Sequence, residues 1–357
     1  MNPIKVAVVG YGGMGGWHTE RIAEMDKFTL TGVWDIDPAQ LDNARACGIH
    51  TYTSYADLLA DDSVELVVVA TWNDVHKPLC IEAMRAGKNV ISEKPVAMNL
   101  KELDEMIAVS HETGKLFTVH QNRRWDEDYL TMRAIAEQNL LGKVFRIESR
   151  VQGSRGIPGD WRREKGHGGG MVLDWGVHLL DQALTMNDQS PLQSVYAQET
   201  HITNDECDDG FYCELQFANG LHYSVEVTTN NFISLPRWYI LGENGSAVIE
   251  DWDLHGKMTL VHNWDKIDSV PIKAGTGITK TMAPRTDETI HDAPLPQVHG
   301  QWTAYYDNIY DAIRNGAPQT VTHRQMRRCL KLIEAEFGMM GRRLRRCADL
   351  AIAARSA

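Results

Sequence analysis

The stretch Ile4-Lys5-Val6-Ala7-Val8-Val9-Gly10-Tyr11-Gly12-Gly13-Met14-Gly15 decides the fold. Its β-branched half predicts a buried strand, and the GxGxxG that follows predicts a tight turn into a helix. Gly10 permits the turn, Gly12 lacks the Cβ that would block a pyrophosphate, and Gly15 lets the helix pack closely on the strand. Helix N–H groups and the helix dipole then favour phosphate. We therefore predict a dinucleotide site at Gly10, Gly12, Gly13, Met14 and Gly15.

An acidic residue stands at the expected distance from this turn. Asp35 follows Gly15 by 20 residues and ends the next predicted strand, Thr29–Trp34. A carboxylate there accepts hydrogen bonds from the adenosine ribose and repels a 2′-phosphate, which predicts NAD rather than NADP. Asp37 is an alternative ribose acid, although Asp37-Pro38 is more typical of a helix start.

Strands and helices alternate through the first third of the chain. The predicted strands are Ile4–Val9, Thr29–Trp34, Val64–Ala70, Asn89–Ser92 and Leu116–His120, and helical spacing covers Asp74–Ala86 and Leu100–Glu112. Parallel strands need long crossovers, so this alternation predicts an α/β, doubly wound Rossmann sheet.

The pattern changes after a predicted helix at Asp126–Leu141. Four further strands are predicted at Gln193–Thr203, Phe211–Phe217, Leu221–Thr229 and Trp238–Leu241, and Asn219-Gly220 and Asn244-Gly245 predict type I′ hairpin turns. Residues 263–300 lack periodicity, and helices near 301–315 and 324–354 close the chain. We predict a dinucleotide domain over 1–122 and an α+β domain with an antiparallel sheet over 123–357.

Composition narrows the class of protein. A chain of 357 residues favours two domains, and a net charge of −12 disfavours nucleic acid and membrane partners. The six cysteines show no metal-ligand spacing, and the N-terminus shows no signal peptide. We expect a cytoplasmic protein.

Polar residues follow the third and fourth main strands, where a doubly wound sheet binds ligands. Thr71, Trp72, Asn73 and His76 are candidate cofactor contacts, although Asp74 in the same loop could cap the next helix and His76 could be a polar core residue. Glu93-Lys94-Pro95 follows the next strand, and Glu93 and Lys94 are further candidate cofactor contacts. Lys94 there could stabilise an alkoxide, the alternative being a surface ion pair with Glu93.

A third group lies near the middle of the chain, at Gly168–His178 in the predicted second domain. Asp174 and His178 are four residues apart, so a helix would place both on one face. Oxidation of an alcohol needs a base, and we predict His178 for this role, with Asp174 orienting the substrate. A metal held by Asp174, His178 and Asp181 is conceivable, but no further ligand cluster supports it, and we predict none.

The domain junction offers substrate contacts. Arg123 and Arg124 follow Asn122 there, and Trp161 with Arg162 would extend the same wall against a polyhydroxylated ring. Interdomain ion pairing is the alternative role for some of these arginines.

Together these motifs resemble the Gfo/Idh/MocA oxidoreductases over essentially the whole chain. The resemblance implies a large, open, mainly antiparallel sheet in the second domain that mediates homodimers or homotetramers. It also implies a catalytic set of Lys94, Asp174 and His178, with Asn122 or Arg123 near substrate and nicotinamide. The run Gln121–Trp125 is similar to the scyllo-inositol dehydrogenase-like branch, which includes NADP users.

These observations predict hydride transfer between NAD and a ring secondary hydroxyl of a sugar, glycoside or inositol. An enzyme that retains NAD and uses transient 3-oxidation for glycoside cleavage or group transfer is one alternative. A dinucleotide-binding sensor without catalysis is another.

Overall fold

The first domain contains the parallel sheet that the sequence predicts. The computed structural model describes residues 2–265 and 271–339. Its first sheet has the order β2-β1-β3-β4-β5. The strands are β1 (Ile4–Val9), β2 (Phe28–Trp34), β3 (Leu66–Val69), β4 (Asn89–Ser92) and β5 (Phe117–Val119). The strand order reverses between β1 and β3, which is where such sheets bind ligands.

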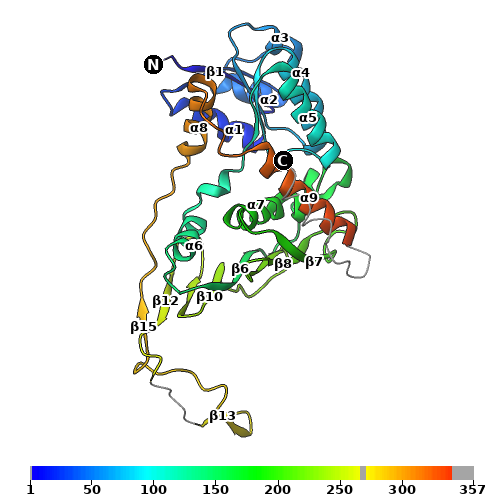
Figure 1. Cartoon of the computed structure of the whole chain (residues 1–357). Coiled ribbons are helices and arrows are strands. Elements are labelled where there is room, and N and C mark those ends of the chain that lie inside the picture. Colours follow the sequence, from blue (N-terminus) through cyan, green and yellow to red (C-terminus); the bar gives the residue numbers. More distant parts are fainter. Residues whose placement is uncertain (1, 266–270, 340–357) are drawn as a thin grey trace.

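Helices cover this sheet on both faces, and local sequence sets several of their ends (Figure 1). They are α1 (Gly13–Ala23), α2 (Pro38–Ala46), α3 (Tyr55–Ala60), α4 (His76–Arg85) and α5 (Leu100–Thr113). The Asp37 side chain caps α2, with Pro38 in the first turn, and Asn99 caps α5 by accepting from the Glu102 N–H.

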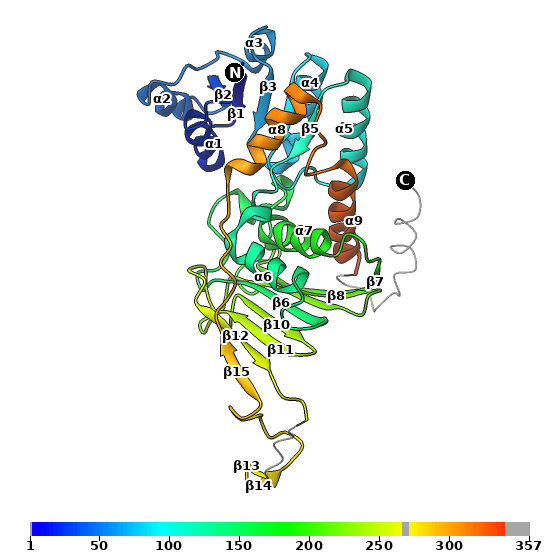
Figure 2. The ribbon, with the colours of Figure 1, turned by 60° about the vertical axis from the view of Figure 1, so that its left-hand side comes forward.

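The second domain is built on an eight-stranded sheet of order β15-β12-β11-β10-β6-β9-β8-β7. The strands are β6 (Val144–Gln152), β7 (Leu192–Thr200), β8 (Gly210–Phe217), β9 (His222–Thr228), β10 (Trp238–Gly242), β11 (Gly245–Ile249), β12 (Gly256–Val261) and β15 (Ile290–Ala293). Only the β6–β9 pairing is parallel, so the predicted mainly antiparallel sheet is confirmed. Helices α6 (Glu127–Glu137) and α7 (Val177–Met186) lie between this sheet and the first domain (Figure 2).

The two predicted hairpins are present, but their turns differ from the type I′ geometry we expected. Gly220 has a φ of +88°, whereas Asn219 is not among the residues of positive φ, and the Gly220 N–H donates to Phe217. In the second hairpin Gly242 pairs with Gly245, so Glu243 and Asn244 form the turn. An Asn-Gly pair also occurs in three-residue hairpin loops, in which only the glycine is left-handed. The pair therefore predicts a hairpin more reliably than it predicts the type of turn.

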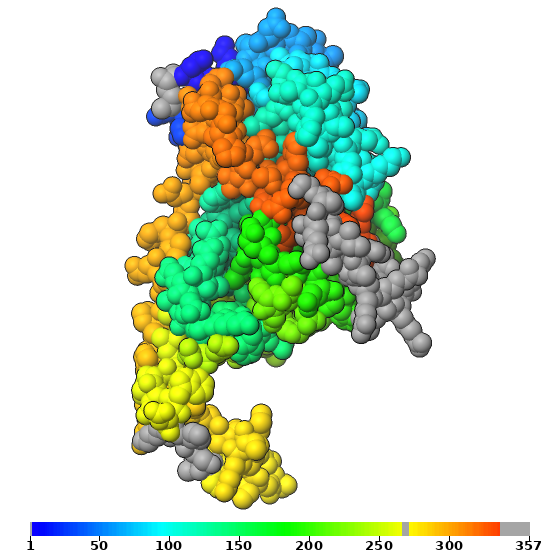
Figure 3. Space-filling view, in the orientation of Figure 1, coloured from blue at the N-terminus to red at the C-terminus, as the bar shows by residue number. Residues whose placement is uncertain are grey.

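Part of the segment expected to be irregular is ordered into strands. A small hairpin of β13 (Ile272–Ala274) and β14 (Gly277–Thr279) stands away from the body, and Figure 3 shows this arm as a separate projection. β15 then pairs with β12 at the sheet edge, and the chain runs back in extended form to the first domain (Figure 1).

Helices α8 and α9 connect the two domains. Tyr305, Tyr306 and Ile309 of α8 (Thr303–Asn315) belong to the hydrophobic core of the first domain. Helix α9 (His323–Met339) contributes Met326 and Leu330 to that core. It also contributes Cys329, Leu332 and Ile333 to the second core. A single domain boundary at residue 122 therefore leaves out α8 and the part of α9 that belong to the core of the first domain. The expected continuation of the last helix to residue 354 lies outside the described residues.

Within residues 2–265 and 271–339, none of the helices combines the length and the apolar character needed to span a bilayer.

Candidate active site

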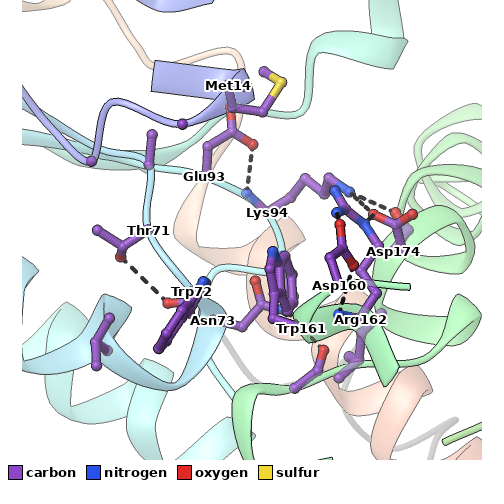
Figure 4. Close-up of a pocket in the computed structure, with 18 of the residues that line it drawn as sticks. Met14, Thr71, Trp72, Asn73, Glu93, Lys94, Asp160, Trp161, Arg162 and Asp174 are labelled. Atoms are coloured by element: carbon purple, nitrogen blue, oxygen red, sulfur yellow. Dashed lines mark hydrogen bonds and ion pairs between the residues drawn. The ribbon is translucent and has the colours of Figure 1, made fainter. Parts of the chain in front are cut away.

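A cleft of about 1030 Å³ lies where the first sheet meets the second domain. Its first wall contains Gly10, Gly12, Gly13, Met14, Asp35, Thr71, Trp72, Asn73, Glu93 and Lys94. Its second wall contains Asn122, Arg123, Asp160, Trp161, Arg162, Asp174, Trp175 and His178. Most of the predicted site residues thus line one cavity (Figure 4).

The glycine turn leaves open space beside Gly12 and Gly13. A Cβ on Gly12 would meet no protein atom within 4 Å, whereas a Cβ on Gly15 would lie 1.9 Å from the Gly10 carbonyl oxygen. Gly10 has a φ of +89°, and its Cβ would lie 2.3 Å from the Ala70 oxygen. Gly10 and Gly15 are therefore needed for packing, and Gly15 does not line the cleft, while Gly12 keeps space open for phosphate.

The acid at the end of β2 is fixed by backbone groups. Asp35 accepts hydrogen bonds from the N–H groups of Tyr11, at 2.6 Å, and Asp37, at 2.8 Å. The Asp37 carboxylate accepts from the Ala39 N–H at 2.9 Å, as expected for a helix cap. Both acids border the cleft, but Asp35 is the one tied to the glycine turn.

The loop after β3 connects the two domains. The Asn73 side chain donates to the Gly168 carbonyl at 2.8 Å, and Asp74 contacts His167 at 3.2 Å instead of capping the helix. His76 is buried and absent from the cleft wall, because its ring nitrogens face the carbonyls of Pro95, at 2.9 Å, and Thr71, at 3.2 Å. Burial lowers the pKa of His76. The expected cofactor contact of His76 is therefore replaced by a role in holding two loops together.

Lys94 and Glu93 do not form a surface ion pair. The Lys94 ammonium crosses the cleft and donates to the carbonyl of Asp174, at 2.7 Å, and to its Oδ1, at 2.9 Å (Figure 4). The Glu93 carboxylate is 4% exposed and turns the other way, toward His18 and His120. Lys94 therefore pairs with Asp174 across the cleft, and Glu93 pairs with the two buried histidines.

Asp174 lies in a π-helical turn, Val172–Gly176, which leads into α7. Burial by itself raises the pKa of this carboxyl, but Lys94 and Arg162 outweigh it, so the pKa is lowered and Asp174 is ionised. The Arg162 Nε lies 3.4 Å from Asp174 Oδ1. Two cations from different domains therefore meet on one carboxylate.

His178 is a buried neutral imidazole on the same wall. His178 is 4% exposed, and its Nδ1 atom has no hydrogen-bond partner among the described residues. Burial first, and then the charges of Lys94 and Arg123, hold the pKa of His178 well below its usual range. A neutral imidazole beside a cationic ammonium can accept a proton from a bound hydroxyl.

Arg123 is immobilised by aromatic rings. Its guanidinium carbon lies 4.3 Å from the centre of the Trp175 ring and 5.7 Å from that of Trp252, and its Nη1 donates to Asp126 at 2.9 Å. Trp161 and Asn122 also line the cleft. Sequence reasoning gave no role to Trp175, although it follows Asp174 directly, or to Trp252, whose loop lies far along the chain from Arg123.

Arg124 does not contribute to the cleft, contrary to the expectation that it binds substrate. It is 5% exposed and forms two hydrogen bonds with Asp181, at 2.6 and 2.7 Å. Its Nη1 donates to the Thr320 carbonyl and to Gln325, both at 3.1 Å. Arg124 therefore ties the domain junction to the connection between α8 and α9 and to the start of α9, and Asp181 is its partner, not a second acid of the site.

The fold and this cleft define a class: two-domain oxidoreductases that bind a dinucleotide at the switch point of a parallel sheet. Residues 4–121 match the family described as "Oxidoreductase family, NAD-binding Rossmann fold", and residues 129–248 match the "GFO/IDH/MocA C-terminal domain". The chain belongs to the Gfo/Idh/MocA oxidoreductase family.

Individual proteins show the same relationship. An uncharacterized oxidoreductase of Escherichia coli, YdgJ, is 27% identical over 93% of this chain and 94% of its own. The scyllo-inositol 2-dehydrogenase (NADP(+)) IolW of Bacillus subtilis is 26% identical over 94% of this chain and 93% of its own. The crystal structure of an NAD-binding protein from Listeria innocua has a TM-score of 0.92 and 44% identity, and covers 96% of this chain and 98% of that one.

Proposed function

We propose that this protein transfers a hydride between NAD and a ring secondary hydroxyl of a neutral sugar, glycoside or inositol. The observation that carries the proposal is the convergence of Lys94, Asp174 and His178 on one cleft beside the glycine turn. When bound, the dinucleotide supplies the hydride acceptor. The residues of this chain supply the rest of the chemistry.

Lys94 is the group that would bind the reacting oxygen. An ammonium has three donors, and two of them already serve the Asp174 carbonyl and carboxylate. The third remains for a substrate hydroxyl, whose negative charge the ammonium stabilises as the hydroxyl ionises. The neutral His178 accepts the hydroxyl proton, and Asp174 holds the ammonium between the domains.

The charge balance of the cleft supports a neutral substrate. Arg162 pairs with Asp160 and Asp174, Lys94 with Asp174, and Arg123 with Asp126. The three carboxylates Asp126, Asp160 and Asp174 balance these three cations, so this part of the site has no excess positive charge to attract an acidic group of a substrate. Trp161 and the exposed Trp72 offer apolar surfaces of the kind on which sugar rings pack.

The experiment is a panel of inositols, free hexoses and glycosides with either dinucleotide, followed by NADH absorbance. Lys94→Met and His178→Ala should lose most turnover while still binding NAD, because neither residue belongs to the glycine turn. Lys77→Met removes a lysine whose ammonium pairs with a carboxylate outside the cleft, that of Glu105, so it is the matched control and should keep full activity. Full activity of both cleft variants would refute the assigned roles. Tightly held NAD with no net NADH formation would instead favour the retained-cofactor alternative.

Asp35 is the basis for proposing NAD over NADP. Its carboxylate is fixed by the Tyr11 and Asp37 N–H groups at the end of β2. Asp35→Ala should raise kcat/KM with NADP relative to NAD, since it removes the charge that repels a 2′-phosphate. Preference of the unaltered protein for NADP would overturn this assignment.

We also propose that copies of the chain associate through the outer face of the large sheet. Phe145, Tyr196, Tyr212 and Tyr239 are exposed on β6, β7, β8 and β10, and monomers rarely expose such groups together. Light scattering should show a dimer or tetramer, and Tyr212→Glu combined with Tyr239→Glu should reduce the mass. A monomeric wild-type protein would contradict this proposal.

A further inference from the structure

A buried polar cluster that the proposed chemistry does not use lies directly behind Lys94. The Oε1 atom of Glu93 is 2.8 Å from Nε2 of His18 and 2.7 Å from Nδ1 of His120. The other ring nitrogen of His18 contacts the hydroxyl of Tyr306. The four residues come from α1, the end of β4, the end of β5 and α8, and none is more than 4% exposed.

The geometry fixes where the hydrogens lie. An ionised carboxylate only accepts hydrogen bonds, so His18 must carry a hydrogen on Nε2 and His120 on Nδ1. His18 Nδ1 is then the acceptor for the Tyr306 hydroxyl. Burial raises the pKa of Glu93, but the two histidines outweigh it and hold the pKa well below its usual range. Burial also lowers the pKa of His18, in agreement with a neutral ring.

Two imidazoles and a carboxylate are also a common set of metal ligands, but the distances favour hydrogen bonds. Ligand atoms around a tetrahedral zinc ion stand roughly 3.3 Å apart, given zinc–ligand distances of about 2.0–2.1 Å. Here one carboxylate oxygen lies 2.8 and 2.7 Å from the two nitrogens, which leaves space for a hydrogen and not for an ion.

The second carboxylate oxygen connects this cluster to the cleft. Glu93 Oε2 accepts a hydrogen bond from the backbone N–H of Lys94 at 3.0 Å. At its other end, Lys94 donates to Asp174 from the second domain. Lys94 is therefore held at its backbone by Glu93 and at its ammonium by Asp174.

We propose that His18 and His120 are positioning residues, which hold Glu93 as a carboxylate so that Glu93 fixes the backbone from which Lys94 reaches the substrate. This inference rests on the proposed role of Lys94. It assigns a function to two histidines that do not line the cleft themselves but contact Glu93, which does. The titratable groups that face or influence Glu93 are His18, His76, Lys94, His120, His178, Tyr305 and Tyr306.

Paired substitutions separate the hydrogen bond from the shape of the side chain. His18→Leu and His120→Leu remove one donor each, whereas His18→Gln and His120→Asn place an amide N–H near Nε2 and Nδ1. The leucine variants should lose about 10- to 100-fold in kcat, because small displacements of a catalytic group have effects of this size, with KM for NAD within about twofold. The amide variants should recover most of that loss.

The pH profile gives a readout that a merely structural role would not move. With one donor removed, burial should bring the protonation of Glu93 into the assay range, so the leucine variants should gain an additional activity loss toward acid pH. Glu93→Gln, which is nearly isosteric, should have low kcat without that additional ionisation. Combining His120→Leu with Glu93→Gln should add little further loss.

A spectroscopic measurement tests the cluster even if no substrate is found. Infrared difference spectra of the full chain without dinucleotide should show a carboxylic acid signal near neutral pH in His120→Leu that is absent from the wild type and from the His120→Leu/Glu93→Gln double variant. Failure of the proposed function alone would leave this signal in place. Wild-type kcat and pH profile in Glu93→Gln, or in folded leucine variants, would overturn the inference, as would one tightly bound zinc ion per chain.

Discussion

The assignment of Arg124 as a structural residue can be tested by breaking its ion pair with Asp181. Both residues are buried, at 5% and 3% exposure, and two hydrogen bonds of 2.6 and 2.7 Å join them. Asp181→Asn keeps the shape of the side chain but leaves the guanidinium charge without its partner. Removing one member of a buried pair typically destabilises a protein by about 3–5 kcal/mol. For a chain of this length that corresponds to a fall in Tm of roughly 4–7 °C.

The chain offers a matched control in Arg327 and Asp104. These residues also form two hydrogen bonds, at 2.6 and 3.1 Å, but their side chains are 51% and 45% exposed. Asp104→Asn should change stability by no more than about 1 kcal/mol, because solvent screens exposed pairs. Thermal and urea unfolding of both variants, with KM for the best substrate of the panel, provide the comparison. If Asp181→Asn and Arg124→Met left stability unchanged and raised KM instead, Arg124 would be a substrate residue and our reasoning would be wrong.

Three further predictions follow from the glycine turn, the buried Asp208 and the Arg123 stack. Gly15→Ala should lower Tm, since its Cβ would lie 1.9 Å from a backbone oxygen, whereas Gly12→Ala should leave Tm unchanged and weaken NAD binding in calorimetry. Burial raises the pKa of Asp208 to about 7, above its unfolded value, so the stability present at acid pH is lost as pH rises toward 7. Asp208→Asn should therefore match the wild type in free energy of unfolding near pH 4 and exceed it at pH 8, by at most about 4 kcal/mol, in urea unfolding at the two pH values; an equal difference at both would contradict this. Trp252→Ala removes one ring beside Arg123 and should raise the substrate KM without changing NAD affinity; an unchanged KM would exclude that role.

The first domain could be predicted well because its determinants are local. Ile4–Val9 is apolar except for the exposed Lys5, and the GxGxxG turn follows it directly, so twelve consecutive residues are enough to predict both the strand and the turn. β6 was not predicted, although it lies near the middle of the second sheet. Its Arg146, Glu148 and Arg150 resemble a solvated segment, and they pair with one another and with Glu226 of a strand about 75 residues away. Such pairing is decided by the tertiary structure.

The site shows the same limit. Residues at strand ends, such as Asp35 and Lys94, could be placed in the cleft because the edge of a parallel sheet is a single location. Arg123 and Arg124 are adjacent in sequence, yet one lines the cleft and the other is buried with Asp181. The partners of Glu93 lie 75 and 27 residues away, so only the folded chain shows that His18 and His120 meet on one oxygen.

Helix α9, whose side chains enter both hydrophobic cores, has a consequence for how the protein can be divided. A fragment ending at residue 122 would expose the surface that Tyr306, Met326 and Leu330 cover, and should aggregate. Joining residues 300–335 to residues 2–122 through a flexible linker should restore a soluble nucleotide-binding unit. Because α9 packs into both cores, it opposes a large rotation of one domain away from the other. A ligand should therefore reach Lys94 through the opening of the cleft while the domains stay in place.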